Sequence, residues 1–337
     1  MAVIANTVNA LQDKWYDRFI GLTAQGGCVG DVVRFSNLLE SHVIGDPTFR
    51  FAPVPGSVDV DGLLLQNKAS SWKRLLKSPL PDVQSLAIEQ LRKAGALSSA
   101  DLLRIYRESP YGVVRLEALM ALSATPDDHF ITAVTEASQD AYELAQRQAI
   151  RFIAKSGDRR LIPALIRLSI ANNTSDRCNF NVMTALACFP KEDLLAEFDR
   201  QFDAPSVQYL DKQNLRGKIR NTIAHSADRL TTDIDKAVKG EASKKERTFT
   251  IRALRNTLPH HKVPELLAYL QACGDGDTQI LLLEALGWHT VSCHATDIAA
   301  TALKMSEDAS LPDAVRQEAL KTYRRIHEKV SPYCSYA

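Results

Sequence analysis

The chain has 337 residues, of which 45% are hydrophobic and 24% are charged, and its formal net charge is +1 at pH 7. These values are typical of a folded globular protein, and the 15 glycines and 14 prolines are too few for collagen-like or intrinsically disordered classes. A chain of this length exceeds the usual size of one compact core, so we expect either two domains or an elongated repeat array.

The first residues, Met1 to Thr7, lack the charged start and apolar run of a signal peptide. No stretch contains the ~20 consecutive apolar residues that a membrane-spanning helix needs. The cysteines form no CxxC pair, which indicates free, mostly buried thiols in a reducing compartment. We therefore expect a cytoplasmic protein with no membrane segment. The cysteines are Cys28, Cys178, Cys188, Cys273, Cys293 and Cys334.

Residues 1–60 are predicted to form an N-terminal helical cap. Apolar residues recur at helical spacing over Asn9–Leu22 and over Val29–Ile44, and Gly26-Gly27 separates the two predicted helices. The segment Gly45–Gly56 is rich in proline and glycine, so we expect a turn-rich connector that either caps or covers one end of the array.

Residues 61–330 carry a repeated pair, an alanine followed by Leu or Ile, and residues 331–337 form a short tail. Successive copies are separated by 31, 31, 36, 38, 30, 32 and 34 residues. A small residue at a fixed point of each helix lets neighbouring helices approach closely, and such periods are typical of solenoids. Only the copy at residue 223 departs from the pattern. The copies are Ala87-Ile88, Ala118-Leu119, Ala149-Ile150, Ala185-Leu186, Ile223-Ala224, Ala253-Leu254, Ala285-Leu286 and Ala319-Leu320.

Each pair is predicted to lie on the inner helix of a helix–turn–helix unit, and outer helices are predicted between them. Ser98 and Asp101 have the spacing of a capping box at the start of one outer helix. Prolines mark the entrances or first turns of the others. These prolines are Pro126, Pro163, Pro190, Pro259 and Pro264.

Two motifs carry a family resemblance. The inner-helix motif Asp-x-Val-Arg-x-x-Ala-Leu at Asp313–Leu320 and the outer-helix motif Gly-Asp-x-Arg-x-x-Pro-x-Leu at Gly157–Leu165 resemble HEAT repeats, in particular the short bacterial type of phycobilisome lyases. The resemblance covers residues 60–328, although several copies lack the motif's arginine. It implies an all-α fold, a right-handed α-solenoid of about eight HEAT-like helical hairpins.

Positive charge is concentrated in one part of the chain. Between Lys212 and Lys262 there are 13 basic and five acidic residues, a balance of +8, so the remainder carries −7. On stacked inner helices these cations are predicted to form a basic strip on the concave surface. The strip is interpreted either as a partner-binding site or as a solvated surface whose arginines bond to aspartates of adjacent repeats. The predicted strip comprises Lys212, Arg216, Arg220, Lys244, Arg247, Arg252 and Arg255.

No catalytic residue, metal site or cofactor is predicted. His289 and Cys293 are four residues apart, but two ligands in one segment do not make a metal site. His260-His261 is interpreted as a cationic pair after a helix end. No Ser-His-Asp set, P-loop or dinucleotide motif is present.

Three enzyme-related classes share the HEAT resemblance. The repeated His-Glu pairs of HEAT-type di-iron hydroxylases are absent. The three tryptophans, Trp15, Trp72 and Trp288, are too dispersed in sequence to indicate the pocket of a HEAT-like DNA alkyl-base glycosylase. A bilin lyase subunit or chaperone that holds a tetrapyrrole is supported by the repeat type alone.

We therefore expect a non-catalytic scaffold or adaptor. Its expected partner is a protein with an acidic surface or segment, bound on the partly basic concave face. A nucleic-acid-binding protein and a tetrapyrrole-binding lyase subunit are the alternatives, and the sequence says nothing of oligomeric state.

Overall fold

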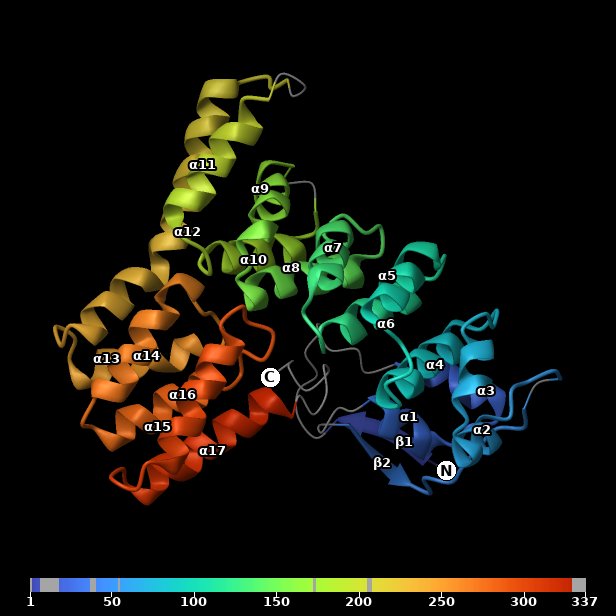
Figure 1. The fold of residues 1–337 in the computed structure, drawn as a ribbon. Coiled ribbons are helices and arrows are strands. Elements are labelled where there is room, and N and C mark those ends of the chain that lie inside the picture. The colour runs from blue at the N-terminus through green and yellow to red at the C-terminus, as the bar shows by residue number, and fades with distance from the viewer. Residues whose placement is uncertain are drawn as a thin grey trace. The chain divides into compact units, whose positions relative to one another are not determined.

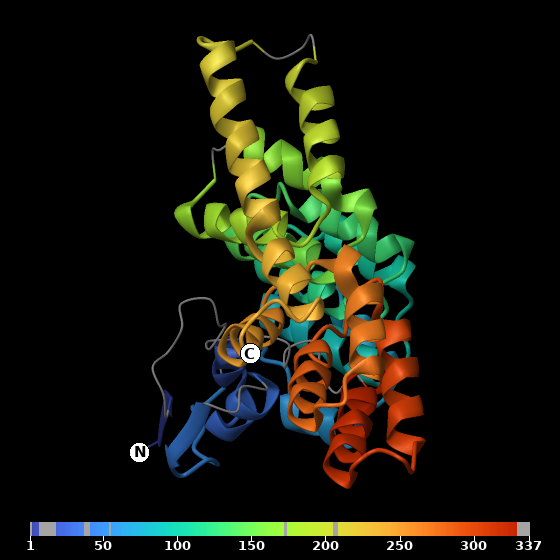
Figure 2. The ribbon, with the colours of Figure 1, turned by 90° about the vertical axis from the view of Figure 1, so that its left-hand side faces the viewer.

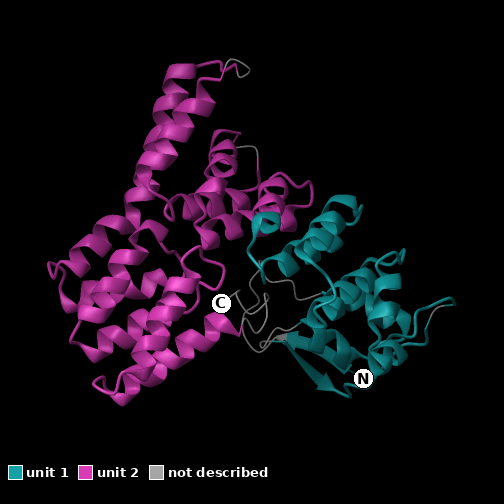
Figure 3. Ribbon diagram, in the orientation of Figure 1, with its two compact units in different colours: residues 1–130, 331–337 teal, residues 131–330 magenta. Residues whose placement is uncertain are grey.

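The structure, a computed structural model, describes residues 2–6, 18–36, 41–53, 55–171, 174–204 and 208–328. Helices make up most of this part, which agrees with the predicted all-α class (Figure 1). The chain divides into two compact units, with the boundary between Phe130 and Ile131 (Figure 3). Unit 1 precedes this boundary and unit 2 follows it.

Unit 1 begins with a two-stranded antiparallel sheet, in which Ala2 pairs with Gly45 and Ile4 with Val43. The prediction of a helix over Val29–Ile44 is therefore wrong in its second part. Helix α1 (Val29–Ser36) is followed by strand β2 (Ser41–Gly45), which pairs with β1 (Ala2–Asn6). Val43 and Ile44 are β-branched and favour extended backbone, and their partner strand lies far away in sequence.

The helix predicted over Asn9–Leu22 falls largely on residues 9–17, outside the described part of the chain. The residues that follow are described, and they form a turn at Arg18-Phe19 and a short 3-10 helix, η1 (Ile20–Gln25). Phe19, Leu22 and Phe35 are buried in one core with side chains of the first helical hairpin.

The remainder of unit 1 is helical. Helix α3 packs on α4, α4 packs on α6, and α5 packs on α6. The core that contains Phe19 also includes Trp72 of α3 and Leu86 of α4, so the described N-terminal residues seal the first hairpin. The helices are α2 (Val60–Gln66), α3 (Ala69–Leu75), α4 (Pro81–Lys93), α5 (Ser99–Glu108) and α6 (Gly112–Leu122).

Unit 2 is formed by helices from the first turn of α7 onward, since the boundary after residue 130 falls inside that helix. Short 3-10 helices, η2 (Arg159–Leu161) and η3 (His260–Lys262), precede α9 and α14. The helices are α7 (Asp128–Ala137), α8 (Glu143–Ser156), α9 (Ile162–Ala171), α10 (Asp176–Leu186), α11 (Lys191–Phe202), α12 (Lys212–Val238), α13 (Lys244–Leu254), α14 (Val263–Ala272), α15 (Gly276–Leu286), α16 (Ala295–Glu307) and α17 (Asp313–His327).

The recurring pairs lie on α4, α6, α8, α10, α12, α13, α15 and α17, which we call the inner helices. In unit 2, α8 packs on α10, α10 on α12, α12 on α13, α13 on α15, and α15 on α17. The alanines of these pairs are fully buried except Ala224 and Ala253, which are half-buried. Small residues are therefore buried on most of the inner helices, and their role in the close approach of neighbouring helices stays a prediction.

Helix α12 accounts for the irregular copy at Ile223. It runs for 27 residues, about 40 Å at the usual rise per residue. Its first half packs with α11 in a hairpin, and residues near its end pack on α13 (Figure 2). The inner helix that carries Ile223 and the outer helix expected after it are thus joined without a turn. Ile223 lies near the middle of this continuous helix.

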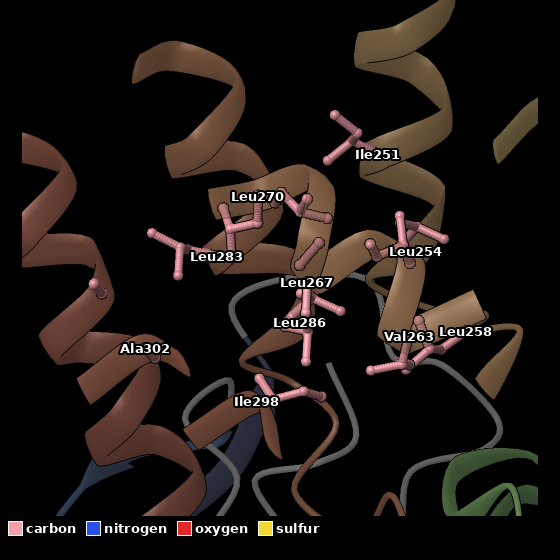
Figure 4. Close-up of a cluster of buried hydrophobic side chains, with 14 of the residues drawn as sticks. Ile251, Leu254, Leu258, Val263, Leu267, Leu270, Leu283, Leu286, Ile298 and Ala302 are labelled. Atoms are coloured by element: carbon pink, nitrogen blue, oxygen red, sulfur yellow. The ribbon is translucent and has the colours of Figure 1, made fainter. Parts of the chain in front are cut away.

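Unit 2 has an extended apolar core between its last helices. Leu254 of α13, Leu267 of α14, Leu286 of α15 and Ile298 of α16 are buried in one cluster (Figure 4). Each of these helices is too short to be stable alone, so burial of the shared apolar face supplies most of its stability.

Local sequence signals position several helix starts. Ser98 and Asp101 form a complete capping box at α5, as predicted. Pro190 is the N-cap residue of α11, and Pro264 lies in the first turn of α14. A second capping box, formed by Ser243 and Glu246 at α13, was not recognised in the sequence.

Candidate partner-binding surface

Three cations of the predicted strip lie in the first half of α12, and all of them face acidic residues at the end of α11. Arg216 bonds to Asp199 at 2.7 Å and to Asp203 at 2.8 Å. Lys212 lies 3.2 Å from Asp203, and Arg220 also pairs with Asp199. Arg216 and then Lys212 hold the pKa of Asp203 below its ordinary value. This part of the strip therefore braces the α11–α12 hairpin.

The other four predicted cations belong to α13 and its C-cap. Arg247 lies 3.9 Å from Asp275, and Arg255 lies 3.4 Å from Glu284. Lys244 and Arg252 form no ion pair with any residue that the structure describes. The α13 group thus keeps more uncompensated positive charge than the α12 group.

The first cations of α12 lie far along the helix from its contact with α13. Ile234, near the end of α12, shares a core with Ile251 of α13. Arg216 lies 18 positions before Ile234 in the same helix, roughly 27 Å along its axis. Arg216 therefore lies well away from the contact between Ile234 and α13.

The exposed face of α13 combines positive charge with an aromatic side chain. Thr250, Ile251 and Leu254 form the buried face of this helix. Lys245, Phe249 and Arg252 follow one another at i, i+4 and i+7 on the opposite face, and all are exposed. Phe249 is 75% exposed, whereas a phenylalanine in a helix usually faces the core. In the sequence, the helical spacing of Thr250, Ile251 and Leu254 could have identified the buried face of this helix, and Phe249 lies outside that face.

A second basic column lies on α8 and was missed in the sequence. Arg147, Arg151 and Lys155 occupy positions i, i+4 and i+8, the same spacing as the cations of α12. Arg147 is 9% exposed, and its burial, together with the nearby Arg177 and Arg151, lowers its pKa. Burial and Arg151 lower the pKa of Lys155 to about 7. Positive charge in unit 2 is thus more widely distributed than the Lys212–Lys262 window indicated.

Neither described tryptophan presents an open ring for base stacking. Trp72 is 2% exposed and donates its Nε1–H to Asn67. The guanidinium carbons of Arg255 and Arg325 lie 4.6 and 4.8 Å from the centre of the Trp288 ring. This cation–π arrangement joins residues at the ends of α13 and α15 to α17. Trp15 lies outside the described residues.

The histidines and cysteines do not assemble a metal centre in the described part of the chain, where no group of three or more suitable ligands is found. His289 is buried and donates Nε2–H to the carbonyl of Leu254. The described cysteines are free thiols; Cys178 and Cys188 are buried, whereas Cys293 is exposed. The prediction of mostly buried thiols thus applies to only part of the set, and Cys334 lies outside the described residues.

His260 differs from its sequence interpretation. It precedes α14 instead of following a helix end, and it is 2% exposed. Burial, and then the neighbouring His289 ring, lower the pKa of His260 to about 3. It is therefore a neutral, buried side chain at neutral pH and not a cation that opposes a helix dipole.

No helix among those described combines the length and the apolar character needed to cross a bilayer. Comparison with models of known protein families and with curated proteins finds no match.

Proposed function

We propose that this protein is a non-catalytic scaffold of the HEAT type, a right-handed α-solenoid of about eight hairpins that binds an acidic protein segment. The buried alanines and the packing of successive inner helices in unit 2 support the solenoid. In such an array, one face of each inner helix packs against neighbouring helices, and another face remains available to bind a partner.

The exposed face of α13 is the proposed contact surface. The observation that carries this proposal is Phe249, 75% exposed between the exposed cations Lys245 and Arg252. An exposed aromatic side chain flanked by Arg and Lys fits a segment in which carboxylates flank an apolar side chain. Lys244 of the predicted strip extends the same positive region, while Lys212, Arg216 and Arg220 serve the α11–α12 hairpin.

The test measures binding of a fluorescent peptide of alternating glutamate and leucine residues by anisotropy, at 50 mM and 500 mM salt. The wild-type protein is expected to bind, with weaker binding at high salt because the charges are screened. The double variant Lys245→Glu/Arg252→Glu is expected to lose at least tenfold in affinity, and Phe249→Ser is expected to weaken binding at both salt concentrations.

The matched control is Lys304→Glu, which reverses an exposed lysine on α16. It should bind the peptide like the wild type. Equal binding by the double variant and the control would remove α13 as the contact surface. Salt-dependent retention of duplex DNA without peptide binding would favour the nucleic-acid alternative, and a visible absorption band on adding biliverdin would favour the tetrapyrrole alternative.

A further inference from the structure

The ends of several inner helices of unit 2 meet at His260. Its Nε2–H donates to the carbonyl of Ala154, in the last turn of α8, at 2.8 Å. Its backbone N–H donates to the carbonyl of Cys188, just after α10, at 3.1 Å. Its Nδ1 lies 3.0 Å from the hydroxyl of Ser292, in the connection between α15 and α16. One histidine thus joins segments up to 106 residues apart.

Two more hydrogen bonds complete the junction. The backbone N–H of Cys293 donates to the carbonyl of Ser156 at 2.7 Å. His289 donates Nε2–H to the carbonyl of Leu254 at 2.7 Å, which adds the end of α13. The rings of His260 and His289 are 6.3 Å apart and nearly perpendicular. The carbonyls at the ends of α8 and α13 are thus satisfied by these partners in place of water.

These bonds are not part of ordinary repeat stacking. In a stacked array each repeat contacts its sequence neighbours, and stability is a sum of such local terms. The bonds Ala154–His260 and Ser156–Cys293 instead join the end of α8 to segments that follow α13 and α15. The inner helices α10, α12 and α13 lie between these segments in the sequence. We infer that His260 and His289 form a latch that closes unit 2 between these non-adjacent repeats, and that mild acid opens it by protonating both rings.

The neutral ring of His260 satisfies all of its hydrogen bonds. A carbonyl oxygen only accepts, so Nε2 carries the proton and Nδ1 accepts from the hydroxyl of Ser292. The same hydroxyl accepts the backbone N–H of His294. A proton on Nδ1 would force that hydroxyl to accept a second donor and would place a charge in a buried site.

The groups around the two rings also oppose protonation. His289 and His294 from the α15–α16 connection and His261 from η3 all disfavour a charge on His260. Lys155 of α8 does the same for His289, whose burial lowers its pKa to about 4 despite the bond to Leu254. Among the described residues, no carboxylate is one of the main groups that act on either ring, whereas His261 has Glu192 and Asp235 as compensating neighbours.

Hydrogen exchange of the amides of His260 and Cys293 tests the latch, since both amides donate across the junction. Exchange is followed by NMR at pH 8 and pH 5 and corrected for intrinsic rates. Each ring is neutral in the closed latch and has an ordinary pKa near 6.5 in the open latch. The equilibrium constant for opening is then expected to rise roughly 30-fold per histidine between pH 8 and pH 5. Amides of α11 and of the first half of α12 are expected to keep their protection.

Variants separate the latch from general acid sensitivity. His260→Gln retains an N–H donor for Ala154 but cannot be protonated, so the pH effect should shrink by roughly 30-fold. If His260→Gln fails to fold, His289→Gln replaces it, and the same roughly 30-fold reduction of the pH effect is expected. His225→Gln is the control, because His225 is an exposed histidine on α12 of the same unit.

Three results would overturn the latch. One is equal protection of the His260 and Cys293 amides at pH 8 and pH 5. Another is a uniform loss of protection across unit 2, which would mean global unfolding. The third is a native-state titration of His260 and His289 near pH 6.5, followed by NMR.

Discussion

The guanidinium of Arg18 lies 2.7 Å from the carboxylate of Glu117 and 2.8 Å from that of Glu89, and all three side chains are buried. Glu89 and Glu117 belong to the inner helices α4 and α6, so Arg18 joins the N-terminal segment to two successive repeats. It also donates to the carbonyl of Phe35. These bonds and the shared core with Phe19 explain how the described N-terminal residues seal unit 1.

Replacing Arg18 with methionine is expected to destabilise unit 1 by about 3–5 kcal/mol, because two buried carboxylates lose the Arg18 guanidinium, although Glu89 keeps its ion pair with Lys93. Urea unfolding followed by circular dichroism measures the change. The control Arg104→Met removes an exposed ion pair with Asp101 on α5 and should have little effect. Adding Glu89→Gln and Glu117→Gln to Arg18→Met should restore part of the loss. A loss no larger than that of Arg104→Met would show that the buried network contributes little.

Gly157 is expected to tolerate no side chain. Its φ is +62°, and a Cβ at this position would overlap the ring of His260. Gly157→Ala should therefore destabilise unit 2 by at least about 2 kcal/mol, the sum of backbone strain and steric overlap. Gly240→Ala is the matched control, because Gly240 has a φ of +76° but no atom within 4 Å of the added Cβ. Thermal unfolding measures backbone strain alone in Gly240→Ala and strain plus steric overlap in Gly157→Ala. Equal losses of stability in the two variants would contradict the close approach of His260 to Gly157.

Stability is expected to fall as pH decreases from 6.5 towards 4. His260 and His289 have folded-state pKa values of about 3 and about 4, below the ordinary 6.5 of the unfolded chain. Between these limits the unfolded state binds more protons, so stability is complete above pH 6.5 and is lost below it. At pH 5 the loss relative to pH 8 is about 2 kcal/mol per histidine. Urea midpoints across this range check the sign, and a flat profile would show that the rings are not buried and neutral.

The recurring alanines are expected to be sensitive to size. Ala149 is fully buried on α8, so Ala149→Leu should cost about 1–3 kcal/mol through overpacking against the adjacent inner helix. Ala253 is only half-buried, so Ala253→Leu should cost less. Differential scanning calorimetry ranks the two variants. A larger loss for Ala253→Leu would contradict the role of small residues at the contacts between inner helices.

Local signals in the sequence determined much of the secondary structure. The spacing of Ser98 and Asp101 predicted a capping box, and Pro264 predicted the first turn of α14, because both depend on residues within one turn. The Ala–Leu period identified the inner helices for a similar reason. Each copy repeats the same short-range packing requirement, so the pattern is visible without knowledge of distant contacts.

The tertiary structure decided the features that depend on distant partners. Val43 and Ile44 form a strand because β1 pairs with them, and Arg216 is neutralised because α11 carries Asp199 and Asp203. His260 is a buried neutral side chain because Ala154 and Ser292 reach it from other repeats. Charge and burial are set by whatever packs against a residue, and a sequence pattern of a single helix carries no record of that neighbour.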